Sequence, residues 1–110
     1  NLDRKSAELG LMNLINAIRE VNSDTKIVIV PPVKITENIL HSGFAMMFNS
    51  DSIEKIREVF EVFKIVADKE NCYYFDFNEI VSPSQEDGIH YSEASHKIIA
   101  DKLSEYILKI

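Results

Sequence analysis

An α/β fold with a parallel sheet is the architecture that this 110-residue sequence predicts. Three segments carry apolar residues at helical spacing, and two short β-branched or aromatic runs lie between them. The resulting order of helix, strand, helix, strand, helix is typical of doubly wound sheets with right-handed crossovers. With 45% hydrophobic residues, the chain has enough apolar side chains to build a core.

The first helix is predicted to run from about Leu2 to Asn22. Its apolar residues recur at steps of three and four, which predicts one buried stripe. The stripe consists of Ala7, Leu11, Leu14, Ile18 and Val21.

The first strand, Lys26–Val30, is rich in β-branched residues and lacks polar alternation. That pattern indicates a strand covered on both faces of a parallel sheet. Pro31 and Pro32 end the strand, because proline has no N–H to donate to a ladder.

The connection that follows, from Val33 to about Ser50, is long and apolar. A loop of this length in a compact domain is usually functional or holds a short helix of its own. Two interpretations stay open here. The loop is either an apolar cluster packed on the surface or a wall of a substrate pocket, since open α/β sheets bind ligands at the carboxyl ends of their strands.

The second helix is predicted to begin at Asp51 as an N-cap, with Glu54 completing a capping box, and to end at residues 69–71. Its buried face is predicted to carry Ile53, Ile56, Phe60, Phe63 and Ala67.

The second strand is predicted over Cys72–Phe77, ending near Asp76, and a polar stretch then leads to the last helix. Ser92 is predicted to cap that helix. The residues expected to face inward are Ile99, Leu103, Tyr106 and Ile107.

A carboxylate and an imidazole, Asp87 and His90, lie just before this last helix. At their spacing the carboxylate can pair with Nδ1 of the ring, which leaves Nε2 to accept a proton from a nucleophile. A surface loop in which Asp87 caps a turn is the plain alternative. Gly88, Ile89 and the capped helix at the expected carboxyl edge of the sheet favour catalysis, with His90 as general base and acid and Asp87 orienting it.

Three further candidates carry less weight. Asp87, His90 and His96 could hold a divalent metal, but no further spaced ligand supports it, so His96 is predicted to be an exposed helical histidine. Cys72 could act as a nucleophile with His90, but at the start of a buried strand it is predicted to be a small core residue. Asp76 is predicted to cap a loop.

The charge and composition exclude some partners. The net charge is −6 and the 12 basic residues are scattered, so nucleic-acid binding through a cationic face is not expected. No apolar stretch approaches the ~18 residues of a membrane span. Cys72 is the only cysteine, which fits a reducing, cytoplasmic compartment. The chain starts at Asn1 without an initiator Met, so further sequence upstream is expected.

Three stretches carry a family resemblance. Residues 26–32 end in a proline pair, residues 73–76 form the next apolar run, and residues 87–94 read Asp-Gly-Ile-His-Tyr-Ser-Glu-Ala. Together they resemble the C-terminal half of an SGNH (GDSL-type) hydrolase, closest to the bacterial arylesterase/acyltransferase-like branch. Residues 1–110 are accordingly expected to be the C-terminal part of a single SGNH domain.

The resemblance implies a three-layer α/β/α sandwich around a flavodoxin-like parallel sheet, here lacking its N-terminal strands. It implies hydrolysis of small-molecule carboxylic esters, or acyl transfer, through a serine acyl-enzyme without metal or cofactor. Asp87 and His90 correspond to the triad acid and base. The substrate pocket is implied to include Pro32, Val33, Phe44 and Ile89.

The same resemblance places the nucleophilic Ser, and the Gly and Asn of the oxyanion hole, upstream of residue 1. The N-terminal half of the domain is therefore an expected partner, and the isolated chain is expected to be inactive.

Two rival interpretations come from other classes. A non-catalytic α/β module or pseudoenzyme would bind a small ligand or a partner through the loop of residues 33–50. An assembly unit would pair its open sheet edge with a second copy as a homo-oligomer.

Overall fold

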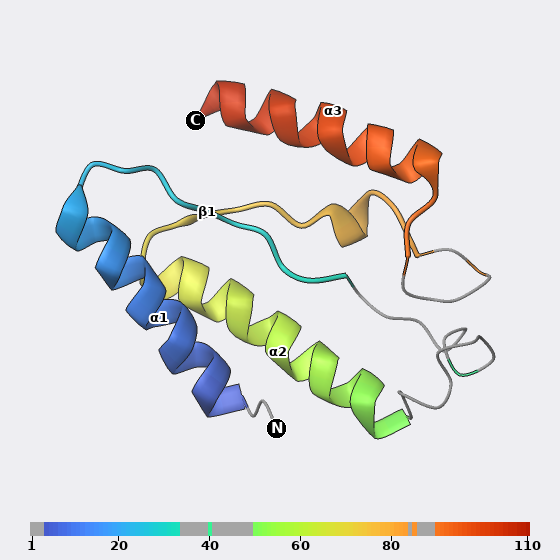
Figure 1. Cartoon of the computed structure of the whole chain (residues 1–110), viewed down its shortest axis with the longest axis horizontal. Helices are drawn as coiled ribbons and strands as arrows, with labels where there is room; N and C mark the ends of the chain where they lie inside the picture. Colours follow the sequence, from blue (N-terminus) through green and yellow to red (C-terminus); the bar gives the residue numbers. More distant parts are fainter. Residues whose placement is uncertain (1–3, 34–39, 41–49, 84, 86–89) are drawn as a thin grey trace.

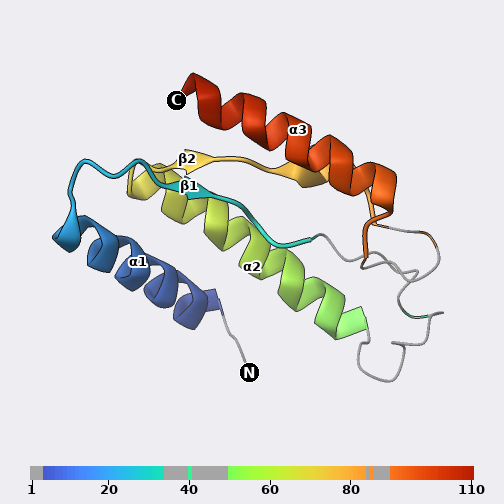
Figure 2. The ribbon, with the colours of Figure 1, turned by 45° about the horizontal axis from the view of Figure 1, so that its top comes forward.

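Three helices and two short strands make up the fold in the computed structural model, which describes residues 4–33, 40, 50–83, 85 and 90–110. Helices α1 and α2 cover one face of the strands, and α3 lies along the other (Figure 1, Figure 2). The predicted α/β class and order of elements are confirmed. The elements are α1 (Arg4–Val21), β1 (Val28–Ile29), α2 (Ser50–Lys69), β2 (Tyr73–Tyr74), the 3-10 turn η2 (Phe77–Glu79) and α3 (Glu93–Lys109).

The two strands pair in parallel, with Val28 opposite Tyr73 and Ile29 opposite Tyr74. Paired residues share a face of a sheet and successive residues alternate between faces. Ile29 and Tyr74 therefore face α1 and α2, whereas Val28 and Tyr73 face α3. Both strands are shorter than the predicted Lys26–Val30 and Cys72–Phe77. β1 ends at Ile29, and the proline pair follows after Val30.

An apolar cluster between α1, α2 and β1 forms the core. Val66 of α2 is fully buried, and Ile15 of α1 is 1% exposed. The ion pairs that also join α1 to α2 are worth ~0–1 kcal/mol each when exposed, so the apolar cluster does most to hold the two helices together. The cluster comprises Ala7, Ile15, Ile29, Val62, Val66 and Ala67.

The inward faces of the helices differ from the prediction at several positions. On α1, Leu14 is 58% and Val21 89% exposed, and Ile15 takes the buried place. On α3, Ile107 is 51% exposed. Neighbouring residues lie about 100° apart around a helix, so two overlapping apolar stripes, one through Leu14 and one through Ile15, fit the same spacing on α1. The contact with α2 and β1 determines which of the two is buried.

The two ends of α2 are built differently. The helix begins at Ser50, so Asp51 lies inside the first turn and is not the N-cap that we predicted. Glu54 accepts a hydrogen bond from Arg57 at 2.6 Å. At the other end, Asn71 has a φ of 54°, and the Cys72 N–H donates to the Ala67 carbonyl at 2.9 Å. With Asn71 in the left-handed conformation, this is the 6→1 bond of a Schellman motif, and it turns the chain toward β2.

Helix α3 begins at the predicted cap, where Ser92 Oγ accepts from the Ser95 N–H at 3.1 Å. Its inner side is half-buried at Ile99, Leu103 and Tyr106, as predicted. The Tyr106 ring lies 5.3 Å from that of Phe75. None of the helices in the described part of the chain has both the length and the apolar content needed to cross a membrane.

Candidate active site

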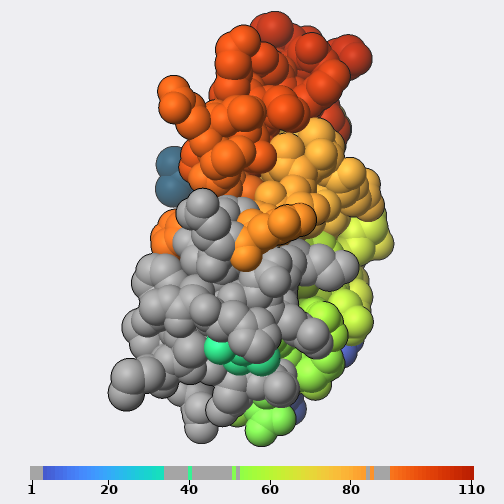
Figure 3. All heavy atoms as spheres, turned by 90° about the vertical axis from the view of Figure 1, so that its right-hand side faces the viewer, coloured from blue at the N-terminus to red at the C-terminus, as the bar shows by residue number. Residues whose placement is uncertain are grey.

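The carboxyl ends of both strands lie beside the start of α3. β1 leads into Pro31 and Pro32, β2 leads into η2, and residues 90–92 enter α3 next to them. Figure 3 looks onto this end of the molecule, with the first turns of α3 in orange beside the yellow-orange η2 region. Open α/β sheets bind their ligands at this edge.

His90 lies at this edge, in a bend two residues before the N-cap Ser92, and its side chain is exposed. An imidazole that must reach a substrate needs such access. Asp87, Ile89 and Phe44 of the predicted site lie outside the described residues. The Asp87–His90 pairing therefore stays a prediction.

Asn78, in η2, connects the segments that meet here. Its Nδ2 donates to the Pro32 carbonyl at 3.0 Å and to Asp76 Oδ1 at 2.9 Å. Its Oδ1 accepts from the Tyr91 hydroxyl at 3.1 Å. The residue after His90 is thereby joined to the ends of both strands.

Asp76 caps η2, as the sequence predicts, by accepting from the Asn78 N–H at 2.9 Å. Asn78 itself was not predicted as a site residue. The available signal is the Asp-x-Asn order after a strand, which is typical of an Asx turn. The long-range partners of Asn78 leave no trace in the local sequence.

Tyr91 is half-buried, and its ring packs edge-on against Phe77 at 5.8 Å and His96 at 6.0 Å. Burial, and then the charge of Asp76, raises the pKa of Tyr91. The hydroxyl therefore stays protonated at neutral pH and donates to Asn78. His96 is exposed on α3, as predicted.

Pro32 and Val33, the described members of the predicted pocket wall, are both half-buried at the end of β1. Pro32 and the His90 segment are joined through Asn78. The structure thus brings part of the predicted wall and the predicted base to one edge of the sheet.

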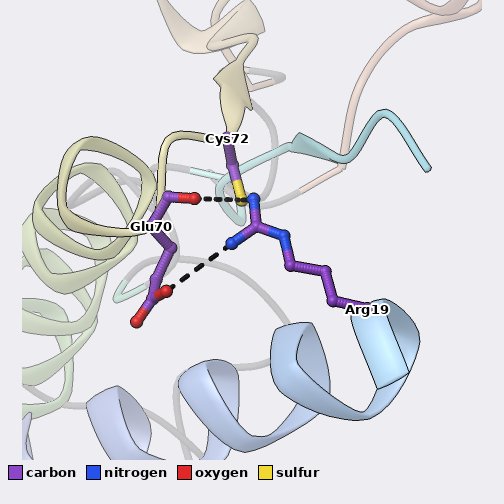
Figure 4. A network of polar contacts seen from close by, with 3 residues as sticks. All are labelled: Arg19, Glu70 and Cys72. Carbon is purple, nitrogen blue, oxygen red and sulfur yellow. Dashed lines mark hydrogen bonds and ion pairs between the residues drawn. The ribbon is translucent and has the colours of Figure 1, made fainter. Parts of the chain in front are cut away.

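Cys72 lies at the opposite, amino end of β2. Its Sγ lies 3.6 Å from Arg19 Nη2, and Arg19 also pairs with Glu70 at 3.6 Å (Figure 4). Burial raises the pKa of the Cys72 thiol, outweighing the nearby guanidinium. A protonated thiol at this end of the strand, away from His90, is a poor candidate nucleophile. Cys72 instead packs half-buried against the core cluster.

A hollow of about 440 Å³ lies elsewhere, between α2 and β2. It contains neither His90 nor Pro32, so we do not take it as the active site, although it shares Asp76 with the Asn78 network. It is lined by Phe60, Glu61, Lys64, Ile65, Tyr74, Asp76 and Glu79. Among the described residues, which exclude Asp87, no group of three or more His, Cys, Asp or Glu side chains could hold a metal ion.

Comparisons with known proteins agree with this geometry. The family described as GDSL-like Lipase/Acylhydrolase matches residues 1–103. The native aryl esterase of M. smegmatis has a similar structure, with a TM-score of 0.77 at 22% identity, over 99% of this chain and 53% of that protein. A second solved structure gives 0.73 at 26% identity, over 96% and 52%. No curated protein matches. The chain spans about half the length of these two structures.

Proposed function

The chain belongs to the GDSL-like lipase and acylhydrolase family, and from that premise we propose that the complete protein hydrolyses carboxylic esters through a serine acyl-enzyme. The observation that carries the proposal is the family match, which runs through both strands and the His90 segment. The exposed position of His90 at the carboxyl edge of the sheet supports it.

In this mechanism Asp87 orients the imidazole of His90 and stays ionised. As the serine oxygen bonds to the ester carbonyl carbon, His90 takes the hydroxyl proton. The C–O bond to the alcohol then breaks, and the alcohol leaves with that proton. Water next attacks the acyl-enzyme and gives a proton to His90. The acid is released as the serine regains its proton, and no metal or cofactor takes part.

We propose that the serine and the oxyanion donors come from outside residues 1–110, within a three-layer sandwich that has a flavodoxin-like sheet. The half-length coverage of the similar structures supports this. Pro32, Val33, Phe44 and Ile89 would line the pocket for a small-molecule ester.

Labelling with a fluorophosphonate tests the location of the nucleophile. We expect one adduct on the full-length protein, and peptide mapping should assign it to a serine outside these 110 residues. An adduct on a serine within the chain would contradict the division of the triad. No adduct at all would favour the non-catalytic binding module.

Replacing His90 with Ala tests the base. In the full-length protein, esterase kcat should fall by roughly 10⁴-fold, because the serine loses its proton acceptor. Lys97→Ala, an exposed change on the first turns of α3, is the control and should keep wild-type turnover. An active His90→Ala protein would refute the assignment.

A further inference from the structure

We propose that Asn78 and Tyr91 form a positioning unit that fixes the His90 segment against the carboxyl ends of both strands. The inference rests on the ester-hydrolase proposal for the role of His90. It assigns Asn78 and Tyr91 a role that does not involve contact with the substrate.

The hydrogen bonds of Asn78 allow only one orientation of its amide. The Pro32 carbonyl and the Asp76 carboxylate are acceptors, so both must face the amide nitrogen. The amide oxygen then faces Tyr91, whose hydroxyl can donate. Turning the amide over would set its oxygen against the Pro32 carbonyl and the Asp76 carboxylate and would break both of those bonds, so the position of the Tyr91 hydroxyl is specified from the strand ends.

The backbone of Asn78 is itself held in place. The Asn78 N–H donates to Asp76 Oδ1, and the Ile80 N–H donates to the Phe77 carbonyl to close η2. Two residues separate β2 from this turn, and the N–H of one of them, Phe75, donates to the Ile29 carbonyl, so Asn78 is held close to the sheet. Its side chain then reaches Pro32, which lies 46 positions earlier in the sequence.

The anchored position of Tyr91 restricts the backbone of His90, its neighbour in the chain. The Tyr91 ring is held between Phe77 and His96, and the next residue, Ser92, caps α3. Neighbouring Cα atoms are about 3.8 Å apart, so anchoring Tyr91 restricts the backbone of His90 closely. The His90 side chain remains exposed. A catalytic group displaced by about 1 Å can lose on the order of 100-fold in rate, so this restraint bears on catalysis.

Tyr91→Phe in the full-length protein is the direct test, because it removes one hydroxyl and keeps the ring. With p-nitrophenyl acetate as substrate, kcat should fall about tenfold and KM should change less than about twofold, since the hydroxyl faces Asn78. Tyr106→Phe is the matched control, because that ring packs on Tyr73 and Phe75 away from the His90 segment. The control should keep the wild-type kcat. Asn78→Ala combined with Tyr91→Phe should cost less than the sum of the two, because both remove the same bond.

Hydrogen exchange gives a readout that does not depend on activity. Peptides covering residues 90–96 should exchange faster in Tyr91→Phe than in the wild type or Tyr106→Phe. Unchanged exchange in these peptides would overturn the positioning unit. The same holds if kcat in Tyr91→Phe is no lower than in the control Tyr106→Phe. A wild-type protein that hydrolyses no ester would refute the proposed function alone, and the exchange data would still decide whether the unit fixes the segment.

Discussion

The hydroxyl of Tyr74 is the clearest unfavourable feature of a single residue. The residue is half-buried, but its oxygen is fully buried without a hydrogen-bond partner in the described part of the chain. A buried polar group without a partner costs about 1–3 kcal/mol. Tyr74→Phe should therefore raise the free energy of unfolding by about 1 kcal/mol at pH 7, measured by urea denaturation. The ring and its contact with Lys64 at 5.0 Å would remain. A less stable variant would mean that the hydroxyl has a partner.

The same residue makes stability depend on alkaline pH. Burial, and then the charges of Asp76, Glu79 and Asp68, raise the pKa of Tyr74 from 10.0 to about 12. As the pH rises, Tyr74 therefore loses its proton in the unfolded chain before it does so in the folded protein. The part of the folding free energy that depends on a protonated Tyr74 is complete below pH 10 and is lost as the pH rises toward about 12. The stability of Tyr74→Phe should decline less over that interval. Some loss of stability at alkaline pH should remain in Tyr74→Phe, because the pKa of Tyr91 is also raised. Equal slopes in the two proteins would contradict the assignment.

Among the elements, the carboxyl end of α2 depends on a residue that tolerates the left-handed conformation. Asn71 has a φ of 54°, which Asn and Gly adopt more easily than residues with other side chains. Asn71→Ala should lower the free energy of unfolding by about 1 kcal/mol, whereas Asn71→Gly should keep it within about 0.5 kcal/mol. Thermal unfolding of the pair checks this. Equal losses in both variants would point to the amide side chain instead of the backbone.

The elements themselves could largely be predicted from the sequence. Both strands were predicted longer than they are. Apolar spacing and capping placed both ends of α1 and α2 and the start of α3 within two residues, because period and capping are local properties. The Ser92 cap and the Asp76 turn were predictable for the same reason. Asn78 was not, because its partners Pro32 and Tyr91 are distant in the sequence, and one polar residue in a turn does not indicate which carbonyl it will meet.

For the whole molecule, the sequence could not decide which side of α1 docks, whereas the inner side of α3 was predicted at Ile99, Leu103 and Tyr106. On α1, Leu14 and Ile15 fit overlapping stripes, and only the contact with α2 and β1 decides between them. Ile15 joins the core cluster, whereas Leu9, Leu14 and Val21 are more than half exposed. Local periodicity cannot contain this information, because the choice depends on residues brought together from three elements.

Ile15 and Leu14 therefore make a matched test of the whole packing arrangement. Ile15→Ala removes a side chain that is 1% exposed and should lower the free energy of unfolding by about 2–5 kcal/mol through lost burial and a cavity. Leu14→Ala truncates a neighbour that is 58% exposed, and its effect should stay within about 0.5 kcal/mol. Urea denaturation of both variants in the full-length protein measures the difference. A small loss in Ile15→Ala would contradict the arrangement, whereas a large loss in Leu14→Ala would mean that a surface other than α2 and β1 also covers the outer face of α1.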